Sequence, residues 1–436
     1  MGKPTVGLPP EIWIHVLRHL SPADRFSVRA SCKYFKHLVD QRTLWRDWSV
    51  VLGFQRGAYN SRFWATLRRR GVAGVVMRGT KAKDWKQLAL FLPSLTTVVM
   101  DQSSHASLDC IKDFTNLKRL AIRSSSTNLL LDASTVYHPQ QLTQLSMCDV
   151  KFPTAGLDRF VSALSQFTNL TSLVCHQVGI FEETIWVIHS ILNCLPKLKH
   201  LSLSIVQRLF AFSNISGPKP GPVGGAGSPV LSSLELIHCI DHSLPEDVMR
   251  LMPGLKTLAV YYRCSNQETT EGCPSPDRHP LNTWLSDLPQ LSTLVIAKGP
   301  PVKNYVSSIP ATVTNLTLCA VGLSSEDMAA VAVQVPNLLH LHLDPWPSHL
   351  GARTAQIPHL FPKLKSLKLR HEHVPERDFL HIHQLQDLGY LEILDSSPQL
   401  SKLAGKLQAL TDYRLQVTTS PRRRDVFSCH CACPVY

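Results

Sequence analysis

One short pattern recurs along most of the 436-residue chain and restricts the folds that the chain can adopt. Each copy ends in a run of the form L-x-x-L-x-L, often preceded by an apolar residue and a proline, as in LPSLTTVVM from Leu92 and FPKLKSLKL from Phe361. Such self-similarity predicts a solenoid, because a single repeat cannot bury its apolar face without neighbours. The first leucine-type position of the copies falls at residues 72, 95, 117, 142, 170, 198, 231, 255, 291, 313, 338, 364 and 391.

The spacing of these copies resembles that of leucine-rich repeats. Ten of the twelve intervals lie between 22 and 28 residues, within the range expected of that family. The two longer intervals contain Pro/Gly-rich stretches, which predict flexible insertions at 213–230 and 263–280 and not domain boundaries. Segments between the copies, such as 156–166 and 182–195, have helical apolar spacing. We therefore expect an α/β solenoid, a horseshoe of about 13 irregular strand-and-helix repeats, over residues 72–417.

Before the repeats, residues 8–47 contain the start and stop signals of three short helices. Apolar residues recur at helical spacing from the Pro9-Pro10 pair to Leu20. The run Ser21-Pro22-Ala23-Asp24 then supplies an N-cap, a proline at the first helical position and an acid at the third, which predicts a second helix. A third apolar segment ends near Asp40. So small a unit buries little surface, and we expect it to need a partner or the next domain for stability.

This N-terminal stretch resembles an F-box along its whole length. The matching residues are Leu8, Pro9, Glu11, Ile12, Val16, Leu20, Pro22, Asp24, Cys32, Phe35, Leu44 and Trp45. The pair Arg25-Phe26 departs from the family pattern, which more often has a leucine at the first position, and we expect the departure to be tolerated. Without the resemblance, the same apolar spacing also fits a three-helix cap on the next domain, with Ile12, Val16 and Leu20 in its core.

What the resemblance implies is docking onto the small acidic Skp adaptor of SCF-type cullin–RING ubiquitin ligases. The residue pattern agrees with this implication, because an apolar stripe on a helix can lie in the groove of a partner. The expected adaptor-binding residues are Leu8, Pro9, Ile12, Val16, Leu17, Leu20, Leu44 and Trp45.

The charge of the chain is concentrated at one end. The formal net charge is +13, and residues 1–80 carry +10 of it. A basic N-terminal segment can steer an acidic protein partner towards the chain. It can also bind nucleic acid, and Arg68-Arg69-Arg70 falls in this segment. We expect no nucleic-acid partner, however, because no stripe of basic residues interleaved with aromatic residues accompanies these arginines.

Binding by the repeats must involve the strand residues that point away from the core, since side chains alternate faces along a strand. These are the second, fourth and sixth positions after the first leucine. The predicted client-binding residues are Arg119, Arg123, His176, Glu235, Tyr261, His340, His342, Asp344, Lys368 and Arg370. The last five lie in two successive repeats and are mainly basic, so we hypothesise that they bind an acidic or phosphorylated segment of a client protein. The alternative is a solvated polar strand face.

No catalytic motif is present in the sequence. It contains no glycine-rich phosphate loop, no HExxH and no GxSxG, so we expect a non-catalytic protein without cofactors. His371, His373, His381 and His383 are possible metal ligands. Both pairs have i, i+2 spacing, which diverges on a helix, and no CxxC accompanies them, so we expect no metal.

The ends of the chain bear on its location. No stretch approaches about 18 consecutive apolar residues, and residues 1–8 lack the apolar core of a secretory signal. We expect a cytoplasmic or nuclear protein whose cysteines remain thiols. The last four residues, Cys433-Pro434-Val435-Tyr436, have the layout of a prenylation box. Membrane association is expected only if Cys433 is lipidated, and 418–436 is otherwise predicted to be a disordered tail.

Taken together, the whole chain resembles F-box/leucine-rich-repeat proteins. The predicted organisation is an all-helical F-box at 1–48, a connecting helical segment at 49–71, the repeats at 72–417 and the tail. The resemblance implies the substrate-recognition subunit of an SCF ubiquitin ligase, in which the F-box binds the adaptor, and through it cullin and RING subunits, while the repeats bind an unidentified client. The alternative is a leucine-rich-repeat scaffold or inhibitor that acts without the ligase.

Overall fold

The computed structural model divides the chain into two compact units, the first running to Leu170 and the second beginning at Thr171. Each unit is described by itself. The residues that the structure describes are 8–45, 48–54, 59–78, 82–101, 111–128, 136, 138–151, 156–176, 184–204, 230–239, 244, 248–262, 280–320, 322–345, 348–395, 397 and 400–420.

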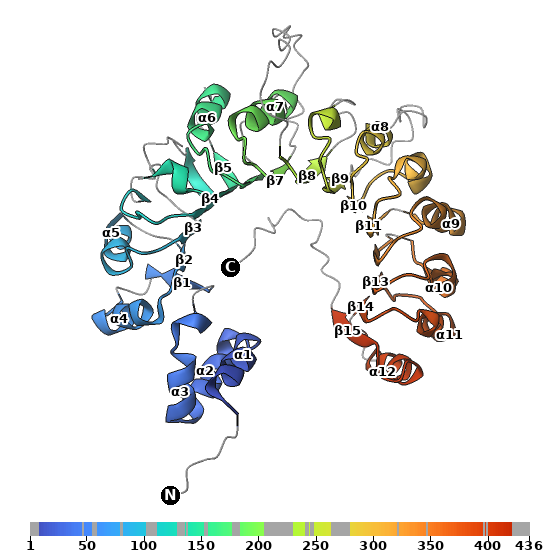
Figure 1. The fold of residues 1–436 in the computed structure, drawn as a ribbon, viewed down its shortest axis with the longest axis horizontal. Coiled ribbons are helices and arrows are strands. Elements are labelled where there is room, and N and C mark those ends of the chain that lie inside the picture. Colours follow the sequence, from blue (N-terminus) through green and yellow to red (C-terminus); the bar gives the residue numbers. More distant parts are fainter. Residues whose placement is uncertain are drawn as a thin grey trace, which may run out of the picture. The chain divides into compact units, whose positions relative to one another are not determined.

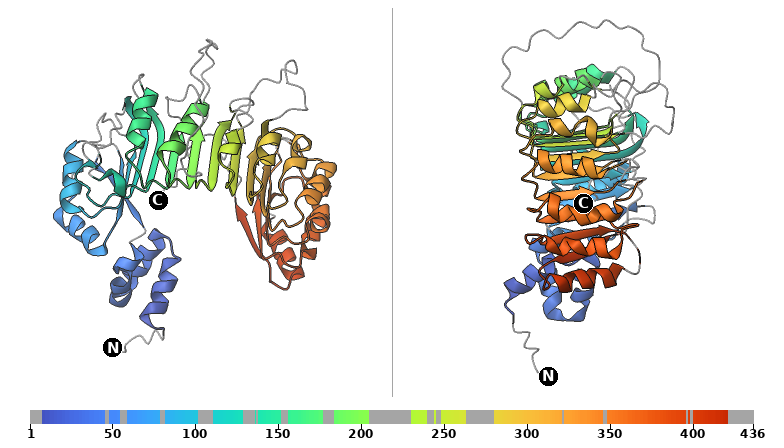
Figure 2. Two further views of the ribbon diagram at one scale, coloured as in Figure 1. Left: turned by 45° about the horizontal axis from the view of Figure 1, so that its top comes forward. Right: turned by 90° about the vertical axis from the view of Figure 1, so that its right-hand side faces the viewer.

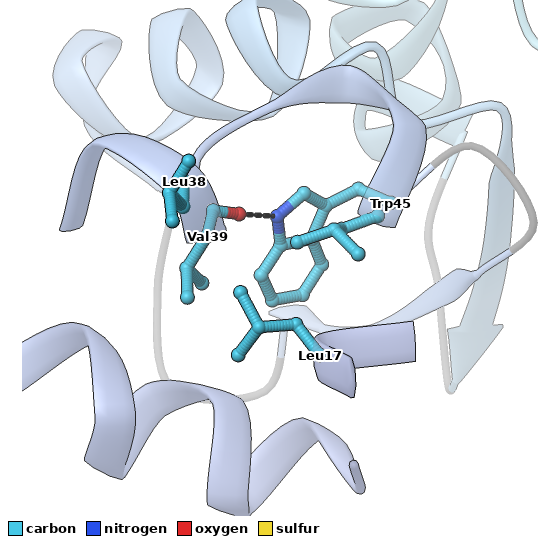
Figure 3. Close-up of a cluster of buried hydrophobic side chains, with 5 residues drawn as sticks. Leu17, Leu38, Val39 and Trp45 are labelled. Atoms are coloured by element: carbon cyan, nitrogen blue, oxygen red, sulfur yellow. Dashed lines mark hydrogen bonds between the residues drawn. The ribbon is translucent and has the colours of Figure 1, made fainter. Parts of the chain in front are cut away.

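Unit 1 begins with the three predicted helices. They are α1 (Pro10–Arg18), α2 (Pro22–Ser31) and α3 (Lys33–Val39), followed by a 3-10 turn at Arg42–Leu44. The predicted cap of α2 is present, since the Ser21 side chain accepts from the Asp24 amide at 3.2 Å. The apolar residues of the three helices meet in one small core, in which Leu17 and Val39 contact Trp45 and the Trp45 indole donates to the Val39 carbonyl (Figure 3).

The repeats of unit 1 follow as parallel strands in sequence order. Neighbouring strands pair in register, so that Val76, Val99 and Ala121 stack in one row. Amides that precede each strand donate to the previous repeat, as Thr96 and Thr97 do to the Ala73 carbonyl. The elements are β1 (Ser49–Gly53), α4 (Ser61–Arg70), β2 (Gly74–Arg78), α5 (Ala82–Phe91), β3 (Thr97–Asp101), β4 (Arg119–Asn128), the turn Pro139–Gln141, β5 (Gln144–Lys151) and α6 (Gly156–Leu164).

Unit 2 has the same construction, with strands along one face and the returning helices along the other (Figures 1 and 2). Its strands are β6 (Ser172–His176), β7 (His200–Ser204), β8 (Ser233–Cys239), β9 (Thr257–Tyr262), β10 (Thr293–Ala297), β11 (Asn315–Cys319), β12 (His340–Leu343), β13 (Ser366–Arg370), β14 (Tyr390–Leu394) and β15 (Gln416–Ser420).

The helical returns of unit 2 vary more than its strands. Several repeats use short 3-10 turns where others use an α-helix. The helices are α7 (Thr184–Cys194), α8 (Pro280–Ser286), α9 (Ser325–Gln334), α10 (Ile357–Leu360), α11 (Glu376–Leu380) and α12 (Leu400–Leu410). The 3-10 turns are Val248–Leu251, Val302–Asn304, Val306–Ser308, Gly351–Gln356 and His381–Gln384. Within the described residues, no helix is long and apolar enough to cross a membrane.

The leucines of the repeated pattern form the core, which confirms the predicted fold class. In the repeat of β13, Leu364, Leu367 and Leu369 are fully buried. The amides of Lys365 and Ser366 both donate to the Leu339 carbonyl of the preceding repeat. Each repeat therefore completes the core and the hydrogen bonds of its neighbour, as the sequence period predicts.

The 13 predicted repeats correspond to β2–β14, and the structure adds one strand at each end. At the N-terminal end, β1 lies within 49–71, where the sequence predicted only a helical connection, because SVVLG lacks the leucine pattern. At the C-terminal end, β15 runs to Ser420 and so includes the first residues of the predicted tail. There Arg414 takes the place of the first leucine and donates to the carbonyls of Leu385 and Leu388.

The last predicted copy was placed in the wrong register. Leu391 pairs with Leu367, the second leucine of its repeat, so the first leucine of that copy is Leu388. The copy is therefore regular and not degenerate, since Leu388, Leu391 and Ile393 are all buried. The predicted insertions, apart from their last residues Val230 and Pro280, lie outside the described residues, as does the tail beyond Ser420 with Cys433.

Candidate protein-binding surfaces

Helix α1 has two apolar faces, and only one of them packs against the protein's own core. Leu17 points into the core and is 1% exposed. Leu8, Ile12 and Val16 recur at i, i+4 and i+8 and remain 46%, 47% and 40% exposed. Ile12 and Val16, at i and i+4, lie on one face of α1, and Leu8 precedes the helix, which begins at Pro10. The structure thus leaves an uncovered stripe of three large apolar side chains, here called the α1 stripe.

The structure separates the eight predicted adaptor-binding residues into two groups. Leu8, Pro9, Ile12 and Val16 are exposed, and Leu20 is half-buried against the core. In contrast, Leu17, Leu44 and Trp45 lie inside the core, so the prediction that they contact a partner is revised, and their role is to position α1. Apolar spacing does not distinguish the adjacent positions 16 and 17, because both are aliphatic and each fits an apolar face of the helix.

The departure from the F-box pattern at Arg25 has a structural explanation. Its guanidinium is 2% exposed and donates to the carbonyls of Leu17 at 2.8 Å, Leu44 at 2.6 Å and Arg18 at 2.8 Å. Two of these carbonyls end α1, where unsatisfied acceptors and the helix dipole favour a cation. The side chain also lies 4.6 Å over the Trp48 ring. Arg25 therefore ties α1 to the end of the three-helix core.

A second arginine joins this core to the first repeat. Asp40, after α3, accepts from Arg29 at 2.9 Å and from Arg70 of α4 at 2.6 Å. The Arg70 guanidinium also lies 4.5 Å over the Trp45 ring. Burial opposes ionisation of Asp40, but the hydrogen bonds from Arg29 and Arg70 outweigh it and lower its pKa to about 2. Of the triplet at 68–70, Arg70 is therefore a structural residue.

The strand face is the set of strand side chains that point away from the helices. In unit 1 it carries Arg119, which is exposed, and Arg123, which is half-buried. The neighbouring Arg78 is paired with Asp101 at 3.1 Å. The predicted client-binding arginines therefore lie on this face, beside an ion pair that links β2 to β3.

In unit 2, two predicted residues, His176 and Glu235, form a hydrogen-bonded chain with the unpredicted Ser202 on β6–β8. His176 Nε2 lies 2.6 Å from Ser202 Oγ, and Ser202 Oγ donates to Glu235 Oε2 at 2.6 Å. His176 and Ser202 are buried, whereas Glu235 is half-buried. Because the Ser202 proton goes to the carboxylate, the histidine donates to this serine and does not act as its base. This arrangement is the reverse of a nucleophilic serine.

Two further side chains surround Glu235. Burial lowers the pKa of His200, with His176 acting in the same direction and Glu235 opposing it. Burial raises the pKa of the predicted residue Tyr261 to about 12, and the Glu235 charge adds to this effect. Both neighbours of the carboxylate are therefore neutral near pH 7.

The predicted basic patch on β12 and β13 is neutralised within the protein. Lys368 pairs with Glu392 of β14 at 3.0 Å, and Arg370 is 2% exposed and pairs with Glu372. Burial lowers the pKa of His342 to about 4, with Lys368 adding to the effect. The hypothesis that this patch binds an acidic segment is therefore revised, because its cations already have carboxylate partners.

The two remaining residues of this group differ in access to solvent. His340 is exposed on β12, and Asp344, directly after the strand, is buried. The sixth position after the first leucine, which was predicted to face outwards, is also buried at His176 and Arg370. Only the second and fourth positions reach solvent in these repeats, because neighbouring strand ends cover the sixth.

The histidines considered as metal ligands have other contacts. His371 lies 3.5 Å from Asp395, and His383 Nδ1 lies 2.6 Å from the Leu380 carbonyl. Among the residues that the structure describes, no three His, Cys, Asp or Glu side chains are grouped as metal ligands would be.

Sequence reasoning missed three residues of these surfaces. Glu392 and Ser202 lie on strands adjacent to predicted residues, and the fourth position of their repeats was the available signal. Phe26 of α2 is 47% exposed, with its ring 5.4 Å from that of Trp45. The signal for Phe26 was its place in the one pair that departs from the F-box pattern.

Comparison with known proteins identifies the N-terminal module. The family model described as F-box-like matches residues 5–49. A search of curated proteins found no match to the chain. Among solved structures, an internalin of Listeria monocytogenes is 13% identical, covers 76% of this chain and 81% of its own, and has a TM-score of 0.35.

A second solved structure is the leucine-rich-repeat-containing protein LegL7 of Legionella pneumophila. It is 15% identical, with a TM-score of 0.44, and the match covers 72% of this chain and 97% of LegL7. The repeat assignment itself rests on the phased leucines and the in-register parallel strands described above. The chain, an F-box-like module followed by such repeats, is an F-box/leucine-rich-repeat protein.

Proposed function

We propose that this protein is the substrate-recognition subunit of an SCF ubiquitin ligase. The observation that carries the proposal is the α1 stripe of Leu8, Ile12 and Val16, which the chain's own core leaves uncovered. F-box domains generally bind a Skp adaptor. A helix that presents exposed apolar side chains at i and i+4, as α1 does with Ile12 and Val16, is suited to the groove of such a partner.

The charge around α1 supports the same partner. The exposed residues of the three helices include Arg18, Lys33 and Lys36. Apolar burial of the α1 stripe supplies affinity, while the basic surroundings accelerate the approach of an acidic adaptor. Cullin and RING subunits would then join through the adaptor, in the cytoplasm or the nucleus.

The repeats would hold the client protein. The ligase partners carry out ubiquitin transfer, and this chain contributes proximity and orientation to the client. The hydrogen-bonded Ser202 is consistent with this non-catalytic role, because its proton is committed to Glu235.

Co-purification tests the proposal. Ile12→Asp and Val16→Asp place a carboxylate in the α1 stripe, and we expect the adaptor and cullin to be lost while the melting temperature stays unchanged. Leu90→Asp is the matched control, since Leu90 lies on α5 and is 74% exposed. Undiminished capture of the adaptor by both stripe variants would reject the proposal. A scaffold that acts without the ligase would instead keep its client and leave client abundance unchanged in these variants.

A further inference from the structure

The strand face of β8–β11 is almost free of charge. Its second, fourth and sixth positions are Ser233, Glu235 and Ile237; Thr257, Ala259 and Tyr261; Thr293, Val295 and Ala297; and Asn315, Thr317 and Cys319. We call these twelve positions the neutral face. Its middle row is continuous, because Glu235, Ala259, Val295 and Thr317 are aligned by the parallel register. Glu235 is the single charged residue and lies at one end of this row.

On both sides of the neutral face, the ionisable side chains discussed above are paired within the protein, hydrogen-bonded or neutral. Towards the C-terminus, Lys368 is paired with Glu392, and His342 is neutral near pH 7. Towards the N-terminus, Ser202 and His176 are hydrogen-bonded to each other. Charges that are paired within the protein contribute little to attracting a ligand, because their desolvation offsets the gain. Recognition by this part of unit 2 therefore depends on the neutral face.

Within unit 2, Glu235 differs from the strand carboxylate Glu392 in lacking a cationic partner among the described residues. Glu392 is paired with a lysine, whereas Glu235 accepts only from the Ser202 hydroxyl. The Ser202 bond fixes one carboxylate oxygen, and the side chain remains half-buried at the edge of the face. A fixed, unpaired carboxylate beside an uncharged surface favours a cationic group of a ligand and repels an anionic one.

We propose that the neutral face binds an extended client segment in which one lysine or arginine, placed against Glu235, adjoins about four uncharged residues. The length follows from geometry. Three strand spacings separate β8 from β11, a span of about 14 Å, which about four residues of extended chain cover. Val295 is half-buried and can contact an aliphatic side chain, while the half-buried Thr293, Asn315 and Thr317 offer hydrogen bonds. This inference rests on the proposed function in one respect, that the repeats hold the client.

Synthetic peptides test the proposal directly. The probes are fluorescein-labelled, end-capped decapeptides of Thr, Val and Ala that carry a single lysine, at the N-terminal end in one peptide and at the C-terminal end in another. In the matched peptides, that lysine is replaced by glutamine, glutamate or phosphothreonine. Binding to the full chain is measured by fluorescence polarisation. We expect the lysine peptide to bind best and the glutamine peptide about tenfold more weakly, because hydrogen bonds to charged groups are the stronger ones. The glutamate and phosphothreonine peptides should bind more weakly still.

Three variants identify the surface responsible. Glu235→Gln keeps the shape and the Ser202 contact, and it should abolish the difference between the lysine and glutamine peptides. Thr317→Lys places a long charged side chain on the uncharged part of the row and should weaken the lysine and glutamine peptides alike. Lys402→Gln removes a charge from the exposed surface of α12, on the helical side of unit 2, and should change nothing. Circular dichroism melting curves check that each variant folds.

The proposal is overturned if phosphothreonine or glutamate peptides bind best, if Lys402→Gln weakens binding as much as Glu235→Gln, or if none of the peptides binds. These outcomes are distinct from failure of the proposed function. Adaptor capture through the α1 stripe is measured separately, so a protein that keeps the adaptor but lacks the peptide preference rejects this inference alone.

Discussion

Helix α1 and the strand face of unit 2 present surfaces of opposite kinds. On α1, Leu17 packs into the core, and a second set of large apolar side chains on another face of the helix remains exposed. On β13, the leucines at 367 and 369 are buried and the intervening Lys368 is paired with Glu392. A helix turns 100° per residue and can carry apolar groups on two faces, whereas a strand alternates and places its leucines on one. Apolar burial is thus available to a partner of α1, while β13 presents a lysine that the protein itself has already paired.

The largest expected effect separates the two faces of α1. Leu17→Ala should lower the free energy of unfolding by about 3 kcal/mol, because it leaves a cavity in the core. Ile12→Ala, which removes a similar side chain from the α1 stripe, should leave stability within about 0.5 kcal/mol but lower adaptor affinity by about 1–2 kcal/mol. Thermal unfolding and adaptor binding of both variants provide the measurement. Equal destabilisation by the two variants would contradict the division into faces.

The strand face should show a pH dependence that α1 lacks. The pKa of His342 in the folded state, about 4, lies below its ordinary value of 6.5, so the unfolded chain binds the proton first. The stability is fully present above about pH 6.5 and is lost as pH falls towards 4, to a limit of about 3 kcal/mol. Hydrogen exchange of β12 and β13 amides across this range measures the loss. His342→Gln should abolish this part of the pH dependence, and an unchanged profile in that variant would refute the assignment.

The ion pairs at Asp40 should matter more than the Lys368–Glu392 pair of the strand face, because Arg70 is buried and Lys368 is partly exposed. Asp40→Asn should cost about 2 kcal/mol of stability near pH 7. Since the pKa of Asp40 is lowered to about 2, this contribution is present above about pH 4 and disappears between pH 4 and 2. The difference in unfolding free energy between the wild type and Asp40→Asn should therefore be clearly smaller at pH 2.5 than at pH 7. A constant difference would contradict the charged interaction.

The smallest effect is expected at Lys368. Its ion pair with Glu392 is partly exposed, with side chains 34% and 20% accessible, and pairs of this kind contribute about 0.5 kcal/mol. Lys368→Met should change stability by no more than this amount, and raising the salt concentration should remove most of the difference. A large loss of stability in this variant would show that the strand face depends on its charges as much as α1 depends on its core.

The sequence predicts the repeats well because one requirement, that each repeat buries its leucines against its neighbours, produces both the leucine period and the strand register. It fails where the chain departs from that period. Arg414 replaces a leucine before β15, and SVVLG in β1 has none of the pattern. It also fails where a contact joins different repeats. Lys368 pairs with Glu392, and Arg70 pairs with Asp40, because their strands or helices are neighbours in the fold. The spacing of residues within one segment does not reveal which segments become neighbours.

The link between Asp40 and Arg70 bears on how the chain can be divided for experiments. A shortened chain that begins at residue 49 would remove the Asp40 carboxylate and the Trp45 ring together, leaving the Arg70 guanidinium without either contact. Such a deletion would damage the first repeat as well as abolish adaptor capture, so a loss of client binding could not be traced to the missing module. Fragments of the N-terminal module should accordingly extend through Gly71, which ends α4 in a left-handed conformation. Substitutions at positions 12 and 16 separate the two activities without cutting the chain.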